Sequence, residues 1–175
     1  MANVPLHSTV LIHERPQLLQ ALTEVLASER RPTRVRILTA TVGPFDLHGS
    51  ASFSHKLQML RAIGATVTLV FGEDPNRLTK EKQEMLMKLE GYGVGVYHRR
   101  TMHAKLVVAY WRNSVHLFMG SANMTRNAFE SNDELAIRAL VQDPATLTAV
   151  DEFVNKKIAG PATRPIKYWS DYWWT

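Results

Sequence analysis

Cysteine is absent from the 175 residues of this chain. Its absence excludes a disulfide scaffold, a thiolate zinc site and a cysteine nucleophile, so any chemistry must come from other side chains. The chain also lacks a run of roughly 20 apolar residues, which a membrane-spanning helix requires. Residues 1–16 lack the charged segment and long apolar core of a signal peptide. We therefore expect a cytoplasmic protein with no membrane partner.

Internal repeats and low-complexity segments are also absent, and the composition is that of an ordinary folded protein. Apolar residues make up 45% of the chain and charged residues 21%, which argues against extensive disorder. The length predicts a single domain over residues 1–175. The net charge of +5 favours a polyanionic partner such as nucleic acid, although many soluble proteins are equally basic without one.

The apolar pattern alternates between helical and strand periods along the chain. Helical spacing predicts helices over residues 15–31, 50–64, 78–93, 123–132 and 143–160. Runs of β-forming residues predict strands over 34–42, 65–72, 94–100, 103–111, 115–122 and 133–141, with a hairpin at 112–114. We expect an α/β fold with a mixed, mostly parallel sheet and helices on both faces. The stretch "GYGVGV" (91–96) follows a helix and precedes a strand, so it predicts a turn rather than a dinucleotide loop.

Two polar residues begin the apolar run 103–111. His103 and Lys105 are two positions apart, so they share one face of a strand. Either residue alone is usually structural or solvated. The next strand ends with Ser121 and Asn123 at the same spacing, next to a predicted helix start. Free backbone N–H groups at a helix start favour an anion, although these residues could equally cap the helix.

A third pair, Asn132 and Glu134, begins the strand over 133–141, where a carboxylate could orient an imidazole. Together the three pairs resemble the His-x-Lys, Gly-Ser-x-Asn and Asn-x-Glu motifs of the phospholipase D superfamily. The resemblance runs from about Arg34 to Leu140, and the C-terminal helix and aromatic tail (141–175) lie beyond it. It implies a phospholipase D-like fold.

The resemblance also implies roles for the motif residues. In that family the His is a nucleophile on phosphorus, so His103 would form a phosphohistidine. Lys105 and Asn123 would stabilise the charged phosphoryl oxygens, and Ser121 would assist in the phosphate contact. Glu134 would fix the tautomer of the imidazole. This chemistry implies no cofactor and no metal, since a protonated Lys has no lone pair for a metal.

One position departs from the family motif. The motif continues to an Asp five residues after the Lys, and Tyr110 stands there in this chain. In a regular strand, position 110 faces away from His103 and Lys105. The departure therefore need not remove a catalytic group, although it leaves room for an inactive member.

The chain contains a single His-x-Lys. None of the other six histidines has a Lys two residues later, yet a second imidazole is needed to protonate the leaving oxygen. Family members with one motif pair two chains, which predicts a homodimer with the two His103 residues facing across a two-fold axis.

Substrate contacts are less specific in the sequence. Arg99 and Arg100 precede the motif and could follow a phosphate backbone, or could be solvated turn residues. Asn132 is a further candidate for substrate binding. Trp169, Trp173 and Trp174 in the tail could bind nucleobases or a membrane interface, but packing on the chain's own domain or a second subunit is the simpler interpretation.

Single-motif chains of this length resemble small bacterial endonucleases and the catalytic domains of phospholipase D-type restriction enzymes. The leading hypothesis is therefore a metal-independent nuclease acting on DNA, with RNA as a second candidate polymer. A lipid phosphodiesterase anchored by the tail aromatics and a nucleic-acid-binding pseudoenzyme remain alternatives. Cleavage without sequence specificity, recognition by a separate domain or subunit, and a fragment of a larger enzyme also stay open.

Overall fold

The computed structural model describes residues 10–12, 15–26, 32–47, 51–112 and 114–166. Its helices are α1 (Arg15–Val25), α2 (Phe53–Ala62), α3 (Lys80–Gly91), α4 (Arg126–Glu130) and α5 (Pro144–Ile158), with a 3-10 helix at Pro75–Arg77. Its strands are β1 (Val10–Ile12), β2 (Arg34–Thr39), β3 (Thr66–Phe71), β4 (Gly95–His98), β5 (Leu106–Trp111), β6 (Ser114–Gly120), β7 (Ala136–Val141) and β8 (Arg164–Pro165). Each helix and strand predicted from the pattern has a counterpart here. The aromatic tail expected to pack on the protein lies outside the described residues from 167 onward.

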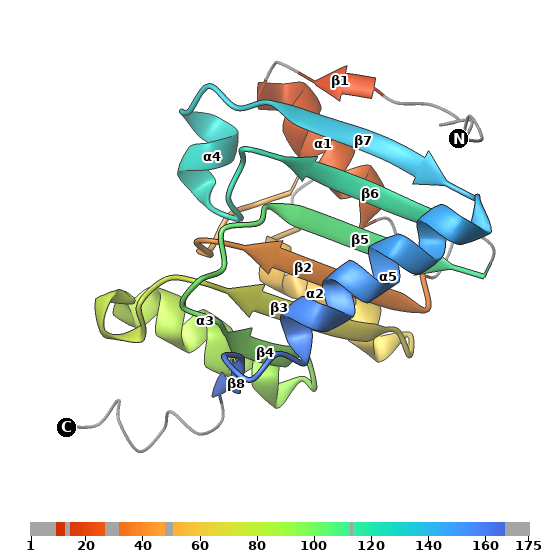
Figure 1. Cartoon of the computed structure of the whole chain (residues 1–175). Helices are drawn as coiled ribbons and strands as arrows, with labels where there is room; N and C mark the ends of the chain where they lie inside the picture. The colour runs from red at the N-terminus through yellow and green to blue at the C-terminus, as the bar shows by residue number, and fades with distance from the viewer. Residues whose placement is uncertain (1–9, 13–14, 27–31, 48–50, 113, 167–175) are drawn as a thin grey trace.

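The described strands form one sheet in the order β1-β7-β6-β5-β2-β3-β4-β8 (Figure 1). Only the pairs β2–β3 and β3–β4 are parallel, and the other five pairs between neighbours are antiparallel. The α/β fold with a mixed sheet is confirmed, but the expectation of a mostly parallel sheet is wrong. The units β2-α2-β3 and β3-α3-β4 each give a parallel pair, whereas β1 pairs with β7 and the β5–β6 hairpin and its neighbours are antiparallel.

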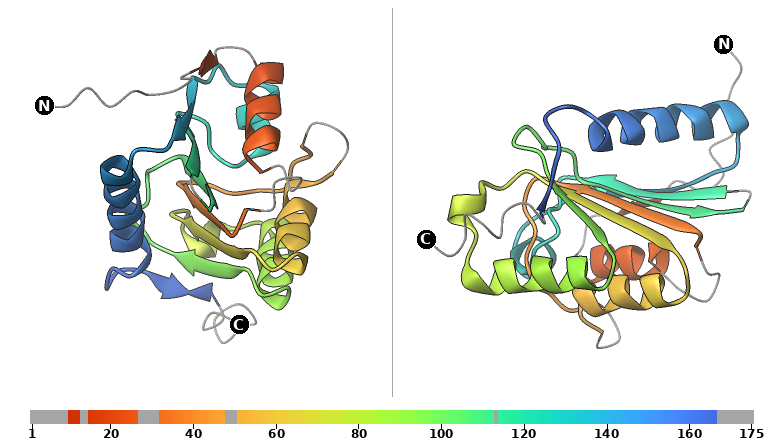
Figure 2. Two further views of the ribbon diagram at one scale, coloured as in Figure 1. Left: turned by 90° about the vertical axis from the view of Figure 1, so that its right-hand side faces the viewer. Right: turned by 90° about the horizontal axis from the view of Figure 1, so that it is seen from below.

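Helices cover both faces of the sheet, as the sequence predicts. Figure 2 shows α1, α2 and α3 on one face and α5 on the other. Leu22, Leu57 and Leu86 from the three helices are fully buried in the larger core. On the opposite face, Val154 of α5 packs in a smaller core that contains Val108 of β5. Alternate residues of the central strands therefore enter two different cores.

Local sequence explains where the longer helices begin and end. The side chains of Ser52, Thr79 and Asp143 accept hydrogen bonds from backbone N–H groups in the first turns of α2, α3 and α5. The stretch 91–96 is confirmed as a turn: α3 ends at Gly91, and Gly93 has a φ of 80°, a left-handed conformation that glycine adopts without strain.

Six strand ends meet at one edge of the sheet. The parallel strands β2, β3 and β4 all end there, and the antiparallel register places the start of β5 opposite the end of β6 through the pair Leu106–Met119. The start of β7 joins them through the pair Gly120–Ala136. The segments that carry the three polar motifs therefore leave the sheet at the same edge.

Candidate active site

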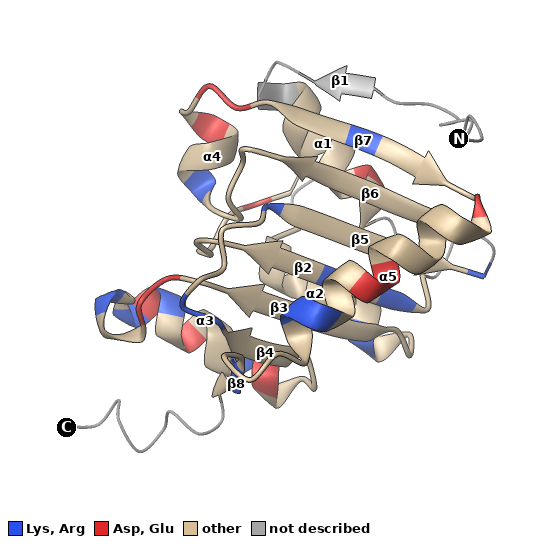
Figure 3. Cartoon of the chain, in the orientation of Figure 1, with Lys and Arg blue, Asp and Glu red and all other residues tan. Residues whose placement is uncertain are grey.

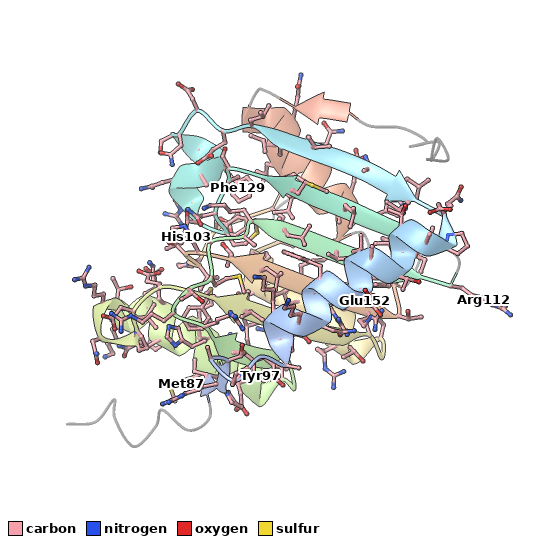
Figure 4. All side chains as sticks on the ribbon, in the orientation of Figure 1. Met87, Tyr97, His103, Arg112, Phe129 and Glu152 are labelled. Carbon is pink, nitrogen blue, oxygen red and sulfur yellow. The ribbon has the colours of Figure 1, made fainter. Side chains whose placement is uncertain are left out.

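His103 and Lys105 lie immediately before β5 rather than inside it, since the regular strand begins at Leu106. Figure 4 places the labelled His103 at the strand-end edge of the sheet, between α4 and α3. Its side chain is exposed, and Lys105 Nζ donates to the backbone carbonyl of His103 at 3.1 Å. The pair thus lies in the segment 102–105 that leads into β5, the lead-in segment, where the Lys105 ammonium contacts the His103 carbonyl.

Gly72 determines how closely this lead-in segment approaches the sheet. A Cβ atom at Gly72 would lie 2.3 Å from the backbone oxygen of Met102, the residue before His103. Met102 itself is buried, and its N–H donates to the carbonyl of Arg99 at 2.8 Å. The end of β3 therefore positions His103 through a contact that only glycine permits.

A second close approach joins the end of β6 to the start of β7. A Cβ atom at Gly120 would lie 2.0 Å from the carbonyl oxygen of Leu135 and 2.7 Å from Cα of Ala136. The next residue, Ser121, donates its backbone N–H to the Leu135 carbonyl at 2.9 Å, and its Oγ accepts from the Leu135 N–H at 3.0 Å. The glycine of the Gly-Ser-x-Asn motif thus allows the serine to sit directly against β7.

The Ser121 hydroxyl and Asn132 both hydrogen-bond to Glu134. Ser121 Oγ donates to Glu134 Oε2, and Asn132 Nδ2 donates to Glu134 Oε1 at 3.2 Å. The sequence predicts that Glu134 orients the imidazole of His103, but no hydrogen bond joins these two side chains within the described residues. In this structure the carboxylate orients the serine hydroxyl and the Asn132 amide instead.

Asn123 is held by the end of β2. Its Oδ1 accepts the backbone N–H of Thr41 at 3.1 Å, which fixes the orientation of the amide. The hydroxyl of Thr39, fully buried, donates to the Thr41 carbonyl at 2.7 Å and accepts from the N–H of Met124 at 3.2 Å. The side-chain NH2 group of Asn123 has no acceptor among the described residues. It is therefore available to donate hydrogen bonds to a ligand.

The structure thus brings five predicted site residues to one edge, and two of them, Ser121 and Glu134, are hydrogen-bonded to each other. The five are His103, Lys105, Ser121, Asn123 and Glu134, and Asn132 joins them through Glu134. The buried Thr39 and the close approach at Gly72 are additions that the sequence motifs do not identify, whereas Gly120 belongs to the Gly-Ser-x-Asn motif. A signal for Gly72 is present, because a lone glycine at a strand end suggests a close backbone approach.

Arg99 and Arg100 differ in their surroundings. Arg99 Nη1 donates to the carbonyl of Lys157 at 3.3 Å and to the hydroxyl of Thr163 at 3.2 Å, close to the end of α5. The guanidinium of Arg99 therefore meets one carbonyl and one hydroxyl near the end of α5, and a contact of Arg99 with a phosphate backbone stays a prediction. Arg100 is exposed, so its placement is compatible with a substrate contact.

Figure 3 shows how the charges are distributed around the sheet. Lys and Arg alternate with Asp and Glu along α3, and in this view the described residues form no continuous basic strip at the strand-end edge. In this view the charges of the described residues are therefore mixed in sign.

Tyr110 lies at the far end of β5 and faces α5. It is buried in the smaller core, which also contacts Ala104 and Leu106, so the predicted opposite parity to His103 and Lys105 is confirmed. The guanidinium of Arg34 lies 3.8 Å from the centre of the Tyr110 ring, which is a cation–π distance. The residue that replaces the motif Asp is therefore part of the packing under α5.

Tyr110 should make the stability of the fold depend on alkaline pH. Burial raises the pKa of Tyr110 to about 12, whereas an unfolded tyrosine titrates near about 10. Between these values the unfolded chain releases the proton and the folded chain keeps it, so the free energy of unfolding falls as the pH rises. Urea unfolding measures the free energy of unfolding at about pH 9 and at about pH 11. The decrease between these two pH values should be smaller for Tyr110→Phe than for the wild type. The exposed Tyr92→Phe should behave as the wild type, and an unchanged pH dependence in Tyr110→Phe would contradict the assignment.

Two cavities adjoin the site. A groove of about 670 Å³ between the sheet and α5 is lined almost wholly by apolar side chains, including Leu135 and Phe153, and reaches Lys105 and Ser121. A second pocket, of about 430 Å³, has a polar lining and includes Asn123 and Asn132. The site therefore borders one apolar and one polar cavity.

Cofactor and membrane features can be stated for the described part of the chain. There, no three His, Asp or Glu side chains cluster closely enough to hold a metal ion. None of its helices is long and apolar enough to cross a membrane.

Comparison with known proteins places the chain in one family. Residues 6–157 match the family described as cardiolipin synthase, PLD-like domain, so the chain belongs to the phospholipase D-like superfamily of phosphodiesterases. A comparison with curated proteins gives no match.

Three solved structures illustrate the likeness. Nuc from Salmonella typhimurium, a phospholipase D family member, has a TM-score of 0.66 at 17% identity over 90% of this chain and 98% of its own. NucT from Helicobacter pylori has a TM-score of 0.66 at 18% identity over 87% of this chain and 96% of its own. TrmBL2, an archaeal chromatin protein, has a TM-score of 0.53 at 14% identity over 90% of this chain and 54% of its own. At these identities the likeness establishes the fold alone.

Proposed function

We propose that the chain is a metal-independent nuclease that hydrolyses DNA through a covalent phosphohistidine on His103. The observation that carries the proposal is the convergence of His103, Lys105 and Asn123 with the Ser121–Glu134 network at one edge of the sheet. These groups supply a nucleophile and several donors for phosphoryl oxygens within one family that performs phosphodiester chemistry.

The first step is attack by an imidazole nitrogen of His103 on phosphorus. A P–N bond forms, the P–O bond to the leaving nucleoside breaks, and a second imidazole gives its proton to the leaving oxygen. In the second step that imidazole takes a proton from water, the water oxygen attacks phosphorus, and the P–N bond breaks. The ammonium of Lys105 and the free amino group of Asn123 stabilise the charge on the phosphoryl oxygens in both steps.

The second imidazole is supplied by His103 of a partner copy, since the sequence contains one His-x-Lys. A homodimer related by a two-fold axis brings two copies of the same edge together. Sedimentation of the active protein should therefore give a dimer, and a monomer with full activity would contradict the mechanism.

DNA is the preferred substrate on three grounds. The chain is basic, Nuc and NucT match it over nearly their whole length, and the structurally similar chromatin protein TrmBL2 binds DNA. RNA presents the same phosphodiester, so single-stranded RNA belongs in the substrate panel.

The apolar groove favours a second candidate, a phosphodiesterase that acts on phospholipids. It reaches Lys105 and Ser121, so an acyl chain could lie in it while the phosphate meets the site. The description of the family that matches the chain also names a lipid enzyme, cardiolipin synthase. The substrate panel must therefore include vesicles.

The test is cleavage of plasmid and single-stranded DNA in excess EDTA, compared with turnover of phosphatidylcholine and cardiolipin vesicles. The proposal predicts EDTA-resistant DNA cleavage and no lipid turnover. Lipid turnover without DNA cleavage would favour the second candidate, and DNA binding without cleavage would indicate a pseudoenzyme. Cleavage that EDTA stops would contradict the metal-independent route.

Thr39 should influence cleavage through Asn123. Thr39→Val keeps the shape but removes the hydroxyl, which leaves the Thr41 carbonyl and the Met124 N–H without their partner. We expect kcat to fall about tenfold with little change in KM, and stability to fall by about 1–3 kcal/mol. Thr39→Ser should restore both, and Thr68→Val on β3 is the matched control. Equal loss of kcat in Thr39→Ser would contradict this role.

A further inference from the structure

Asn123, the last residue of the Gly-Ser-x-Asn motif, lines the polar pocket of about 430 Å³. Its walls come from three separate segments: the connection after β2, the first turn of α3, and the region from Asn123 through α4 to Asn132. The volume lies in the range of ligand pockets, which is roughly 300–1,000 Å³. It therefore has room for a group attached to a phosphate that is bound at Asn123.

Hydrogen bonds and a partly buried ion pair hold these walls in place. The N–H of Gly43 donates to the carbonyl of Met124 at 2.8 Å, which ties the connection after β2 to the segment before α4. Lys82 Nζ lies 2.7 Å from Glu73 Oε1, with both side chains less than one fifth exposed. The N–H of Asn132 donates to the carbonyl of Asn127 at 2.8 Å. The pocket is thus largely preformed.

The lining suits a neutral, hydrogen-bonding ligand better than a second phosphate. Its cations are each paired with a carboxylate, Lys82 with Glu73 and Arg126 with Glu130, and Glu81 adds a negative charge. The remaining lining is rich in amides and hydroxyls, which both donate and accept. This set matches the edges of a base and a sugar rather than a polyanion.

Asn127 is the clearest free group in this pocket. It lies on α4 with an exposed side chain, and within the described residues that side chain has no hydrogen-bond partner. Its backbone carbonyl already accepts from Ser131 and Asn132. The amide of Asn127 can therefore serve a ligand without disturbing the fold.

We propose that this pocket binds the nucleoside next to the scissile phosphate, with Asn127 contacting the base or sugar. The inference rests on the proposed nuclease function and names where that substrate's neutral part lies. In this proposal the enzyme selects among phosphodiesters by the group attached to the phosphate. Residues of α4 and of the connection after β2 contact that group.

The test compares three ligands on the full chain by NMR titration of ¹⁵N-labelled protein: inorganic phosphate, thymidine 5′-monophosphate and glycerol 3-phosphate. In the wild type, thymidine monophosphate should bind about tenfold tighter than phosphate, the gain expected from one or two hydrogen bonds. Asn127→Ala should reduce this ratio about fivefold. Gln142→Ala, an exposed amide just after β7, is the matched control and should leave the ratio unchanged.

Each other outcome overturns a defined part of the proposal. Equal binding of phosphate and thymidine monophosphate, or a ratio insensitive to Asn127→Ala, overturns the nucleoside pocket. A gain for glycerol 3-phosphate that equals the gain for thymidine monophosphate assigns the pocket to a lipid headgroup instead. A further outcome is that the ratio of the affinities for thymidine monophosphate and phosphate behaves as expected while DNA is not cleaved in EDTA. In that case the proposed catalysis fails and the assignment of the pocket stands.

Discussion

His103→Ala should lower the kcat for DNA cleavage by at least about 10⁴-fold, because no other group can form the covalent intermediate. His103 is exposed, so the substitution should leave stability within about 0.5 kcal/mol of the wild type. DNA affinity should change little, since Lys105 and Asn123 remain. Single-turnover cleavage with excess enzyme measures the chemical step directly.

Mixed chains test whether two His103 side chains share one site. When wild-type and His103→Ala chains are co-refolded in equal amounts, random pairing leaves about one quarter of the dimers with two imidazoles. The specific activity should fall to about a quarter of the wild-type value, whereas independent sites would leave about half. His55→Ala, an exposed histidine on α2, is the control and should cleave normally. Retained cleavage by pure His103→Ala would exclude the phosphohistidine.

Gly120→Ala should have the second largest effect, on both stability and cleavage. The added Cβ would lie 2.0 Å from the carbonyl oxygen of Leu135, a backbone atom of the residue just before β7. Relief requires β6 and β7 to separate where Ser121 meets Glu134. We expect a loss of about 2–3 kcal/mol in the free energy of unfolding. A fall of about 100-fold in kcat should accompany it, because donors near the phosphate would be displaced.

Gly91→Ala provides the matched control. A Cβ at Gly91 meets no atom within 4 Å, and the residue ends α3 at an ordinary helical φ. This variant should be as stable as the wild type or more stable by about 0.5–1 kcal/mol. Gly120→Ala with wild-type stability and kcat would show that the contact between β6 and β7 does not constrain the site.

The sequence predicts the helices and strands well where apolar residues recur with a clear helical or strand period. The apolar spacing of Leu18, Leu22 and Val25 defines α1, and the β-branched run at 66–71 defines β3. It does not reveal β1 and β8, of three and two residues, because such short edge strands carry no periodic signal. The expectation that most strand pairs are parallel is wrong, since the pairing of β1, β7 and β8 and of β2 with β5 depends on contacts between segments far apart in the chain.

The site could be predicted as a set of residues but not as a network. Motif spacing identifies Ser121 and Glu134, yet only the structure shows that they bond to each other. Thr39 lies 84 residues from Asn123, and nothing local marks it as a support. The contact of Arg99 with the carbonyl of Lys157 could not be predicted for the same reason, since the two residues lie 58 positions apart.

The most direct test of the central claim is to look for the covalent intermediate. Wild-type protein is mixed with excess DNA, quenched with strong base during turnover to preserve a P–N bond, and digested with trypsin. The proposed mechanism predicts a nucleotidyl adduct on the peptide 101–105, which contains His103 as its single histidine. Cleavage that proceeds to completion while this peptide stays unmodified at every quench time would contradict it.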